Sequence, residues 1–339
     1  MNWYLKRTLQ ALFTIYLVVS FTFVLIRQLP GGPAEYIRAQ LIQSKGGSLT
    51  TQEMQQLNAL VEAYVNIDTD KPLWQQYIDY IASVFTGDLG RSIWHQAPVS
   101  EVIASRLPWT IFLMATAITL TFTCGIALGA LMAYAEGSKF DLGFSGVATF
   151  MTSVPYYVVA ILLVYILGYQ LQLFPTGGRM TPGTVPGLNY AFFAGVLTHA
   201  ALPIASMFVT GVGGRALGMR GNSVRVMGED YIRVAQLRGL DSRRIALHYV
   251  ARNALLPLYT SLMISIGFMF GGAVILEEVF NYKGVGLLLF QSISTRDYTL
   301  MMGCFLVITV AVVIGIFIAD LTYGKLDPRL ESGERHESF

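Results

Sequence analysis

Charged side chains are scarce in this chain. Asp, Glu, Lys and Arg together make up 13% of its 339 residues, about half the share of roughly 25% that a soluble globular chain carries. Hydrophobic residues supply 54%, and the formal net charge is +2. These proportions exclude an ordinary cytosolic enzyme, a disordered chain and a nucleic-acid-binding protein.

Residues for catalysis or metal binding are also few. The two cysteines, Cys124 and Cys304, lie in separate apolar runs, an arrangement that provides neither a disulfide framework nor a metal site. The histidines have no zinc-like spacing, and the chain has no Gly-x-x-x-x-Gly-Lys-Ser/Thr phosphate loop. We therefore predict a protein that is not an enzyme and has no catalytic, cofactor or metal site of its own.

Six long stretches of the chain carry no charge at all. They are rich in Leu, Ile, Val, Phe, Ala and Met and cover residues 8–26, 107–135, 142–178, 180–214, 253–276 and 298–319. A bilayer span needs about 20 mostly apolar residues, so the sequence predicts an all-α integral membrane protein with six transmembrane helices. The first stretch is expected to remain as an uncleaved span, because it is too long for a signal-peptide core and no small-x-small site follows it.

The length and the residue types of these stretches limit the classes of membrane protein to which the chain can belong. Two of them, 142–178 and 180–214, are longer than one span, so each is expected to include re-entrant or loop residues. None of the six contains Asp or Glu, which argues against a proton- or sodium-coupled carrier. A self-sufficient channel or secondary transporter is the alternative to a permease that works with partners, and a membrane-embedded enzyme fails for want of clustered catalytic residues.

The distribution of positive charge predicts the orientation, because positive charge marks the cytoplasmic side. Segment 215–252 holds eight arginines against three acidic residues, whereas segment 30–105 holds four basic and eight acidic residues. Basic residues also precede the first span and follow the last. We predict that both termini and segment 215–252 are cytoplasmic and that segment 30–105 is extracytoplasmic.

The predicted organisation has four parts. They are the N-terminal end with the first span (1–29), an extracytoplasmic helical segment (30–105), a core of five helices that includes the loop 215–252 (106–323), and a cytoplasmic tail (324–339). Within the second part, residues 51–65 and 73–85 place apolar residues at helical spacing. Amphipathic helices there suit a cap over the outer mouth and equally a docking surface for an external partner.

The loop 215–252 contains a signal for one compact helix. Its residues are Glu229, Asp230, Tyr231, Ile232, Arg233, Val234, Ala235, Gln236, Leu237, Arg238, Gly239 and Leu240. Acidic residues open it, where the helix dipole favours negative charge, and Gly239 supplies a left-handed stop. Asp241 or Ser242 then caps a second helix. A helix this short is marginal alone, so it is expected to bind a soluble partner or, through its arginines, anionic lipid headgroups.

This segment resembles the cytoplasmic loop signature of ATP-binding-cassette (ABC) importer permeases of the peptide and nickel branch. Arg233-Val234-Ala235 stands where the signature has Glu-Ala-Ala, so this chain keeps only the second alanine of those three residues. The resemblance continues in order along the chain, in Leu29-Pro30-Gly31-Gly32-Pro33, Gly87-Asp88-Leu89-Gly90-Arg91-Ser92, Leu173-Phe174-Pro175-Thr176-Gly177-Gly178, Gly284-Val285-Gly286, Arg296-Asp297-Tyr298 and Leu326-Asp327-Pro328-Arg329.

The resemblance implies the type I ABC importer permease fold and the role of a B-type permease for di- or oligopeptides. It also implies four partners: a homologous C-type permease, one or two ATPase subunits that carry ATP and Mg, an extracytoplasmic substrate-binding protein, and the lipid bilayer of the plasma (inner) membrane. Residues 229–240 would form the helix that couples to the ATPase. Some relatives carry nickel or oligosaccharides, so the substrate stays open.

Three residues are candidates for the transport pathway. Tyr156 and Tyr157 follow Pro155, which removes a backbone hydrogen bond and is expected to break the span. His199 is a polar group in an uncharged run, where such groups are often functional, although it suits the outer end of the fourth span as well. Hydropathy does not fix the rotation of a span, so we predict no further pathway residue.

Overall fold

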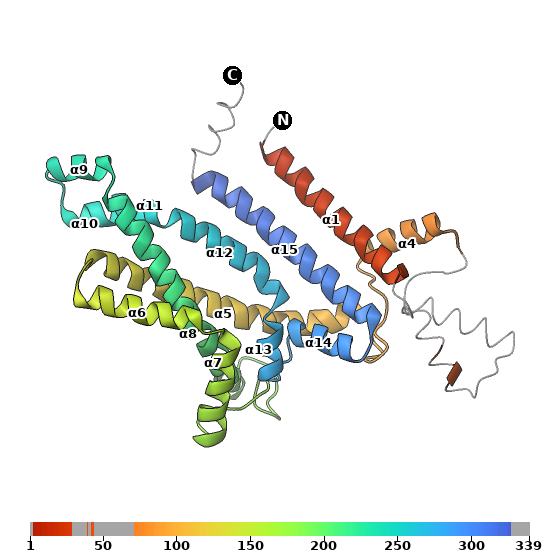
Figure 1. Cartoon of the computed structure of the whole chain (residues 1–339). Helices are drawn as coiled ribbons and strands as arrows, with labels where there is room; N and C mark the ends of the chain where they lie inside the picture. The colour runs from red at the N-terminus through yellow and green to blue at the C-terminus, as the bar shows by residue number, and fades with distance from the viewer. Residues whose placement is uncertain (1–2, 29–38, 40–41, 44–70, 327–339) are drawn as a thin grey trace. The chain divides into compact units, whose positions relative to one another are not determined.

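The chain is seen here in a computed structural model, which describes residues 3–28, 39, 42–43 and 71–326. The described residues are mainly helical, with one isolated β-bridge between Arg91 and Pro98. They form two compact units, whose helices are labelled in Figure 1. The helix predicted at 51–65 lies outside the described residues.

The first unit contains the described residues up to Thr110, together with Phe270–Val274 and the residues from Gly284 onward. Its helices are α1 (Trp3–Gln28), α4 (Leu73–Thr86), the first part of α5 (Val99–Tyr134), α14 (Val285–Ser294) and α15 (Tyr298–Leu326). Helix α15 packs along α1 and also contacts α14 (Figure 1). The uncharged stretches 8–26 and 298–319 thus each lie within a single helix, as predicted.

Helix α4 packs on α1 through aromatic rings. The ring of Phe23 lies 5.4 Å from that of Tyr77 and 5.6 Å from that of Tyr80, centre to centre, and Ser20 Oγ is 2.6 Å from the Tyr77 hydroxyl. The helix predicted at 73–85 is therefore confirmed. Its other face exposes four large apolar side chains, Leu73, Trp74, Ile78 and Phe85. Whether this face caps the mouth or docks a partner stays a prediction.

The second unit contains Ile111–Met269 and Ile275–Lys283. Its helices are the rest of α5, α6 (Lys139–Ser153), α7 (Tyr156–Leu163), α8 (Tyr190–Met227), α9 (Asp230–Leu237), α10 (Ser242–Arg244), α11 (Arg252–Ala254), α12 (Leu256–Phe268) and α13 (Val274–Val279). Two π-helical stretches, Val164–Gln170 and Ile245–Ala251, continue α7 and α10. Helices α6 and α7 both pack against α8.

Four described helices, α1, α5, α8 and α15, are long and apolar enough to cross a bilayer. Two bent pairs meet the same test only when joined: Lys139–Ser153 with Tyr156–Gln170, at 90°, and Ser242–Ala254 with Leu256–Gly271, at 46°. The number of spans reaches the predicted six if each bent pair is one span. The first bend lies at Pro155, as predicted, because proline has no N–H and forces the preceding residue out of the helical region.

Two helix boundaries differ from the predicted parts. Helix α5 begins at Val99, so residues 99–105 of the predicted outer segment form its first turns. Helix α8 continues to Met227, so the first 13 residues of the predicted loop 215–252 are helical. Charge alone does not end a helix, because arginine has a high helix propensity, and the buried side chains of Met219 and Val226 hold this extension in place.

Helices α5 and α8 approach each other closely through two glycines. A Cβ at Gly125 would lie 2.5 Å from Arg215 Cβ, and a Cβ at Gly129 would collide with the carbonyl oxygen of Ala216. Small residues four apart let helix backbones meet in this way. The contact brings the last turns of α5 against the part of α8 that leads to α9.

Candidate functional site

The residues at the two ends of α9 explain where this helix begins and stops. Asp230 lies in the first turn, Glu229 precedes it with extended backbone, and Gly239 has the left-handed φ of 69°. The Asp241 carboxylate then accepts hydrogen bonds from the amides of Arg243 and Arg244, at 3.1 and 3.4 Å. The predicted helix, its glycine stop and the cap of the following helix are confirmed, although the Glu229 side chain makes no cap hydrogen bond.

The inner face of α9 is fixed to the core of the second unit. Ile232 is 1% exposed and Ala235 is 4% exposed. They belong to one buried cluster with Met219, Val226, Ile245, Val250, Ala254 and Leu258. This cluster joins α9 to the end of α8 and to the helix that leads into α12, so a movement of α9 displaces both.

The outer face of α9 is apolar and positively charged. Tyr231, Val234 and Leu237 are exposed, and Leu237 is 81% exposed. Arg233 and Arg238 are exposed on the same helix. A short helix that exposes three large apolar side chains close to two cations is suited to bind a partner with an apolar groove and an acidic rim.

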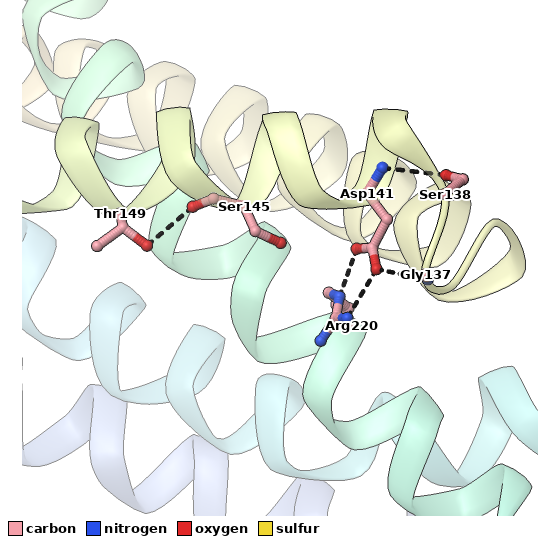
Figure 2. Close-up of polar contacts among 6 residues, drawn as sticks. All are labelled: Gly137, Ser138, Asp141, Ser145, Thr149 and Arg220. Carbon is pink, nitrogen blue, oxygen red and sulfur yellow. Dashed lines mark hydrogen bonds and ion pairs between the residues drawn. The ribbon is translucent and has the colours of Figure 1, made fainter.

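An ion pair between a buried carboxylate and a partly exposed arginine anchors α8 close to this helix. Arg220 Nη2 lies 2.7 Å from Asp141 Oδ2, and Arg220 Nε donates to the other carboxylate oxygen (Figure 2). The Gly137 amide also donates to Asp141, at 3.0 Å, and Ser138 Oγ caps the Asp141 amide at 3.1 Å. Asp141 is 0% exposed, so the first turn of α6 and the last third of α8 are held together.

The sequence analysis missed this pair. A signal was present, because a carboxylate at the start of a long uncharged run is costly to bury unless a cation pairs with it. The sequence offers eight arginines in segment 215–252 as partners for Asp141, and only the folded chain identifies Arg220.

A second feature is a cavity of about 610 Å³ in the second unit, which is open to the surface of that unit. Helices α5, α6, α7, α8 and α12 each contribute lining residues, which are Met114, Ala117, Ile118, Thr121, Phe122, Thr152, Tyr156, Met207, Thr210, Gly211, Gly214, Arg215, Ile264, Ser265 and Phe268. Another cavity, of about 570 Å³, lies behind α9 and is mostly apolar in its lining, with Met219, Ile232 and Val250 among its residues.

The three predicted pathway residues occupy different places. Tyr156 lines the 610 Å³ cavity. The Tyr157 ring packs edge-on against Tyr156 with centres 5.8 Å apart, but Tyr157 is not among the lining residues. His199 is 8% exposed, and its Nδ1 lies 2.7 Å from the Gly195 carbonyl oxygen on its own helix. A pathway role for the three residues stays a prediction.

Arg215 is a lining residue that the sequence analysis counted only as part of the loop. It lies on α8 within the candidate span Tyr190–Met227 and borders the cavity together with Tyr156. Its position could not be read from hydropathy, because the uncharged run ends one residue earlier. Among the described residues, no group of three His, Cys, Asp or Glu side chains could hold a metal ion.

Comparisons with known proteins identify the family. Residues 125–332 match the family described as the inner membrane component of binding-protein-dependent transport systems. The chain is 33% identical to a Brucella suis protein described as a peptide permease, over 96% of this chain and 98% of that protein. It is 30% identical to the oligopeptide transport system permease protein AppB of Bacillus subtilis, with the same two coverages.

Further likenesses agree with this result. The dipeptide transport system permease protein DppB of Bacillus subtilis is 31% identical over 94% of each chain. A chain of the inward-facing MetNI methionine ABC transporter matches the fold with a TM-score of 0.53 and 13% identity, over 67% of this chain and 96% of that one. The protein therefore has the type I permease fold and belongs to the family of inner membrane components of binding-protein-dependent ABC transport systems.

Proposed function

We propose that this chain is one of two permease subunits of an ABC importer for di- or oligopeptides. A homologous C-type permease forms the other half of the pathway, and an extracytoplasmic binding protein delivers the peptide. One or two partner ATPase subunits bind ATP and Mg, and this chain has no catalytic role. The relatives described as peptide, oligopeptide and dipeptide permeases support the substrate class.

The observation that supports the proposal most directly is that α9 has one buried face and one exposed apolar face. The side chains of its inner face are buried in a core shared with α8, while Tyr231, Val234 and Leu237 are exposed on its outer face. We propose that a groove of the ATPase receives this outer face. Closure of the ATPase dimer then moves α9, and the shared core passes that movement to α8.

The orientation in the membrane is part of the same proposal. We place α9, both termini and the ATPase on the cytoplasmic side of the plasma (inner) membrane. The seven arginines between residues 220 and 252 support this side, because positive charge favours the cytoplasm. Segment 30–105, with its excess of acidic residues, lies outside where the binding protein arrives.

Co-purification after crosslinking in intact membranes tests the assembly. We expect a tagged chain to bring down a second permease and an ATPase, with crosslinks from the ATPase to residues 229–240. Crosslinking before detergent extraction removes dissociation as an explanation for a missing subunit. A chain that is crosslinked to no ATPase and moves solute without ATP would be a channel or carrier instead.

Reconstitution of the purified assembly tests the substrate. Vesicles that contain the transporter, its binding protein and ATP on the ATPase side are expected to take up labelled di- or tripeptides. Uptake of oligosaccharides or nickel in place of peptides would keep the permease role and change the substrate class.

A further inference from the structure

Arg215 is a cation inside a candidate membrane span with little to neutralise it. Its guanidinium carbon lies 4.2 Å from the centre of the Phe122 ring, and Nη2 lies 3.4 Å from Ser265 Oγ. The hydrogen bond is long, and such bonds are weak. No carboxylate of the described residues forms an ion pair with Arg215, whereas Arg220 on the same helix has Asp141 on two of its nitrogens.

This arginine is half-buried and lines the 610 Å³ cavity. The cavity is lined by no other charged residue, and its volume is in the range of about 300–1,000 Å³ that is typical of small-molecule sites. A cation within the bilayer is costly when unpaired and commonly marks a pathway for a charged solute.

Arg215 is the only cation among the residues that line this cavity, whose polar groups also include the hydroxyls of Thr121 and Tyr156. The hydroxyls of Thr152, Thr210 and Ser265 donate to carbonyl oxygens of their own helices. Their remaining capacity is to accept hydrogen bonds, which does not suit an anion. The guanidinium has five N–H donors, and one of them is directed at Ser265. Its planar fork matches the two oxygens of a carboxylate.

We propose that Arg215 binds the C-terminal carboxylate of the transported peptide in this cavity. The inference rests on the proposed function, because it assigns a contact to a peptide substrate. Phe122 and Ser265 hold the guanidinium toward the cavity, and Tyr156 and the apolar side chains of α5 and α12 enclose the rest of the peptide.

The test compares uptake of a tripeptide with uptake of its C-terminal amide, in vesicles of zwitterionic lipid, whose headgroups carry no net negative charge. The assembled transporter carries the wild-type chain, Arg215→Gln, Arg215→Lys or Ile118→Ala. We expect Arg215→Gln to slow uptake of the acid about 10- to 100-fold, the range for loss of a charge-assisted hydrogen bond, and to leave uptake of the amide near its wild-type rate. Arg215→Lys should keep part of the preference.

Comparing each variant with wild type separately for acid and amide cancels any preference of the binding protein. Ile118→Ala is the matched control, because it changes the lining of the cavity but keeps the contacts of the guanidinium with Phe122 and Ser265; it should slow acid and amide alike. Equal loss of both peptides in Arg215→Gln would overturn the proposal and leave Arg215 a packing role between α5, α8 and α12. Wild-type vesicles that take up neither peptide would overturn the proposed function instead.

A second measurement does not depend on the amide being delivered. A tripeptide with a photoreactive group next to its carboxylate is added during turnover, and crosslinked fragments are identified by mass spectrometry. We expect crosslinks to α8 between Met207 and Arg215 in the wild-type chain and at least a tenfold reduction in Arg215→Gln. Crosslinks of equal yield in both proteins would overturn the carboxylate contact.

Discussion

Arg220 on α8 donates hydrogen bonds from two nitrogens to the carboxylate of Asp141 on α6, which lies 79 residues earlier in the chain. Asp141 is fully buried and also accepts a hydrogen bond from the Gly137 amide (Figure 2). The pair therefore fixes the start of α6 to the part of α8 that supports α9. Loss of Arg220 therefore leaves a buried carboxylate without its cation.

Arg220→Gln should lower the unfolding temperature of the purified chain by about 5–10 °C, because a buried carboxylate without its cation is strongly destabilising. The double variant Asp141→Asn/Arg220→Gln should lose less stability than the sum of the losses measured for the two single variants. The measurement is the fraction of protein that remains monodisperse after heating in detergent. Additive losses would show that the two side chains do not stabilise each other.

Leu237→Asp should reduce co-purification of the ATPase about tenfold, because a charge would replace a large apolar side chain at a partner surface. Leu188→Asp is the matched control. Leu188 is 97% exposed in the connection between α7 and α8, outside α9, so its substitution should leave ATPase binding unchanged. Equal recovery of the ATPase with both variants would remove Leu237 from the proposed contact.

Gly239→Ala should destabilise the end of α9 by about 1–2 kcal/mol, because an L-residue is strained at the φ of 69°. No atom lies within 4 Å of an added Cβ, so the cost comes from the backbone alone. Gly239→Asn should be milder, since asparagine tolerates the left-handed region better. Hydrogen exchange of the α9 amides measures the difference; identical protection in both variants would contradict the backbone explanation.

Gly129→Ala should destabilise the packing of α5 on α8 by about 1–3 kcal/mol, because the new methyl group would overlap the Ala216 carbonyl oxygen. The control is Gly143→Ala on α6, where no atom lies within 4 Å of the added Cβ. That substitution should be neutral or stabilising by up to about 1 kcal/mol. Thermal unfolding in detergent compares the two, and similar losses would argue against a tight contact at Gly129.

Features that depend on short stretches of sequence could be predicted. The uncharged runs identified the apolar helices, Pro155 located the break between α6 and α7, and Gly239 with Asp241 defined the end of α9 and the start of the next helix. Each of these features rests on the chemistry of neighbouring residues: hydropathy, a missing N–H, a permitted positive φ or a side-chain cap.

Features that depend on helix rotation and on distant contacts could not be predicted. The arginines from Arg215 to Arg252 looked alike in the sequence, yet one lines a cavity, one pairs with Asp141 and others lie exposed at α9. The helical extension of α8 past Arg215 was missed for the same reason, because its stability comes from packing of Met219 and Val226 rather than from composition.

Helix α8 connects the cavity, the ion pair with Asp141 and the core beneath α9, because residues of all three lie on it. At 1.5 Å per residue, its 38 residues extend about 57 Å, nearly twice the roughly 30 Å of a bilayer core. Its interior proline is Pro203, and helices bend most readily at proline. Arg215, Arg220 and Val226 all follow that proline on an unbroken segment. We therefore expect a tilt imposed at α9 to rotate this segment as a rigid body about Pro203. The same rotation would change both the width of the cavity and the position of the Arg215 guanidinium.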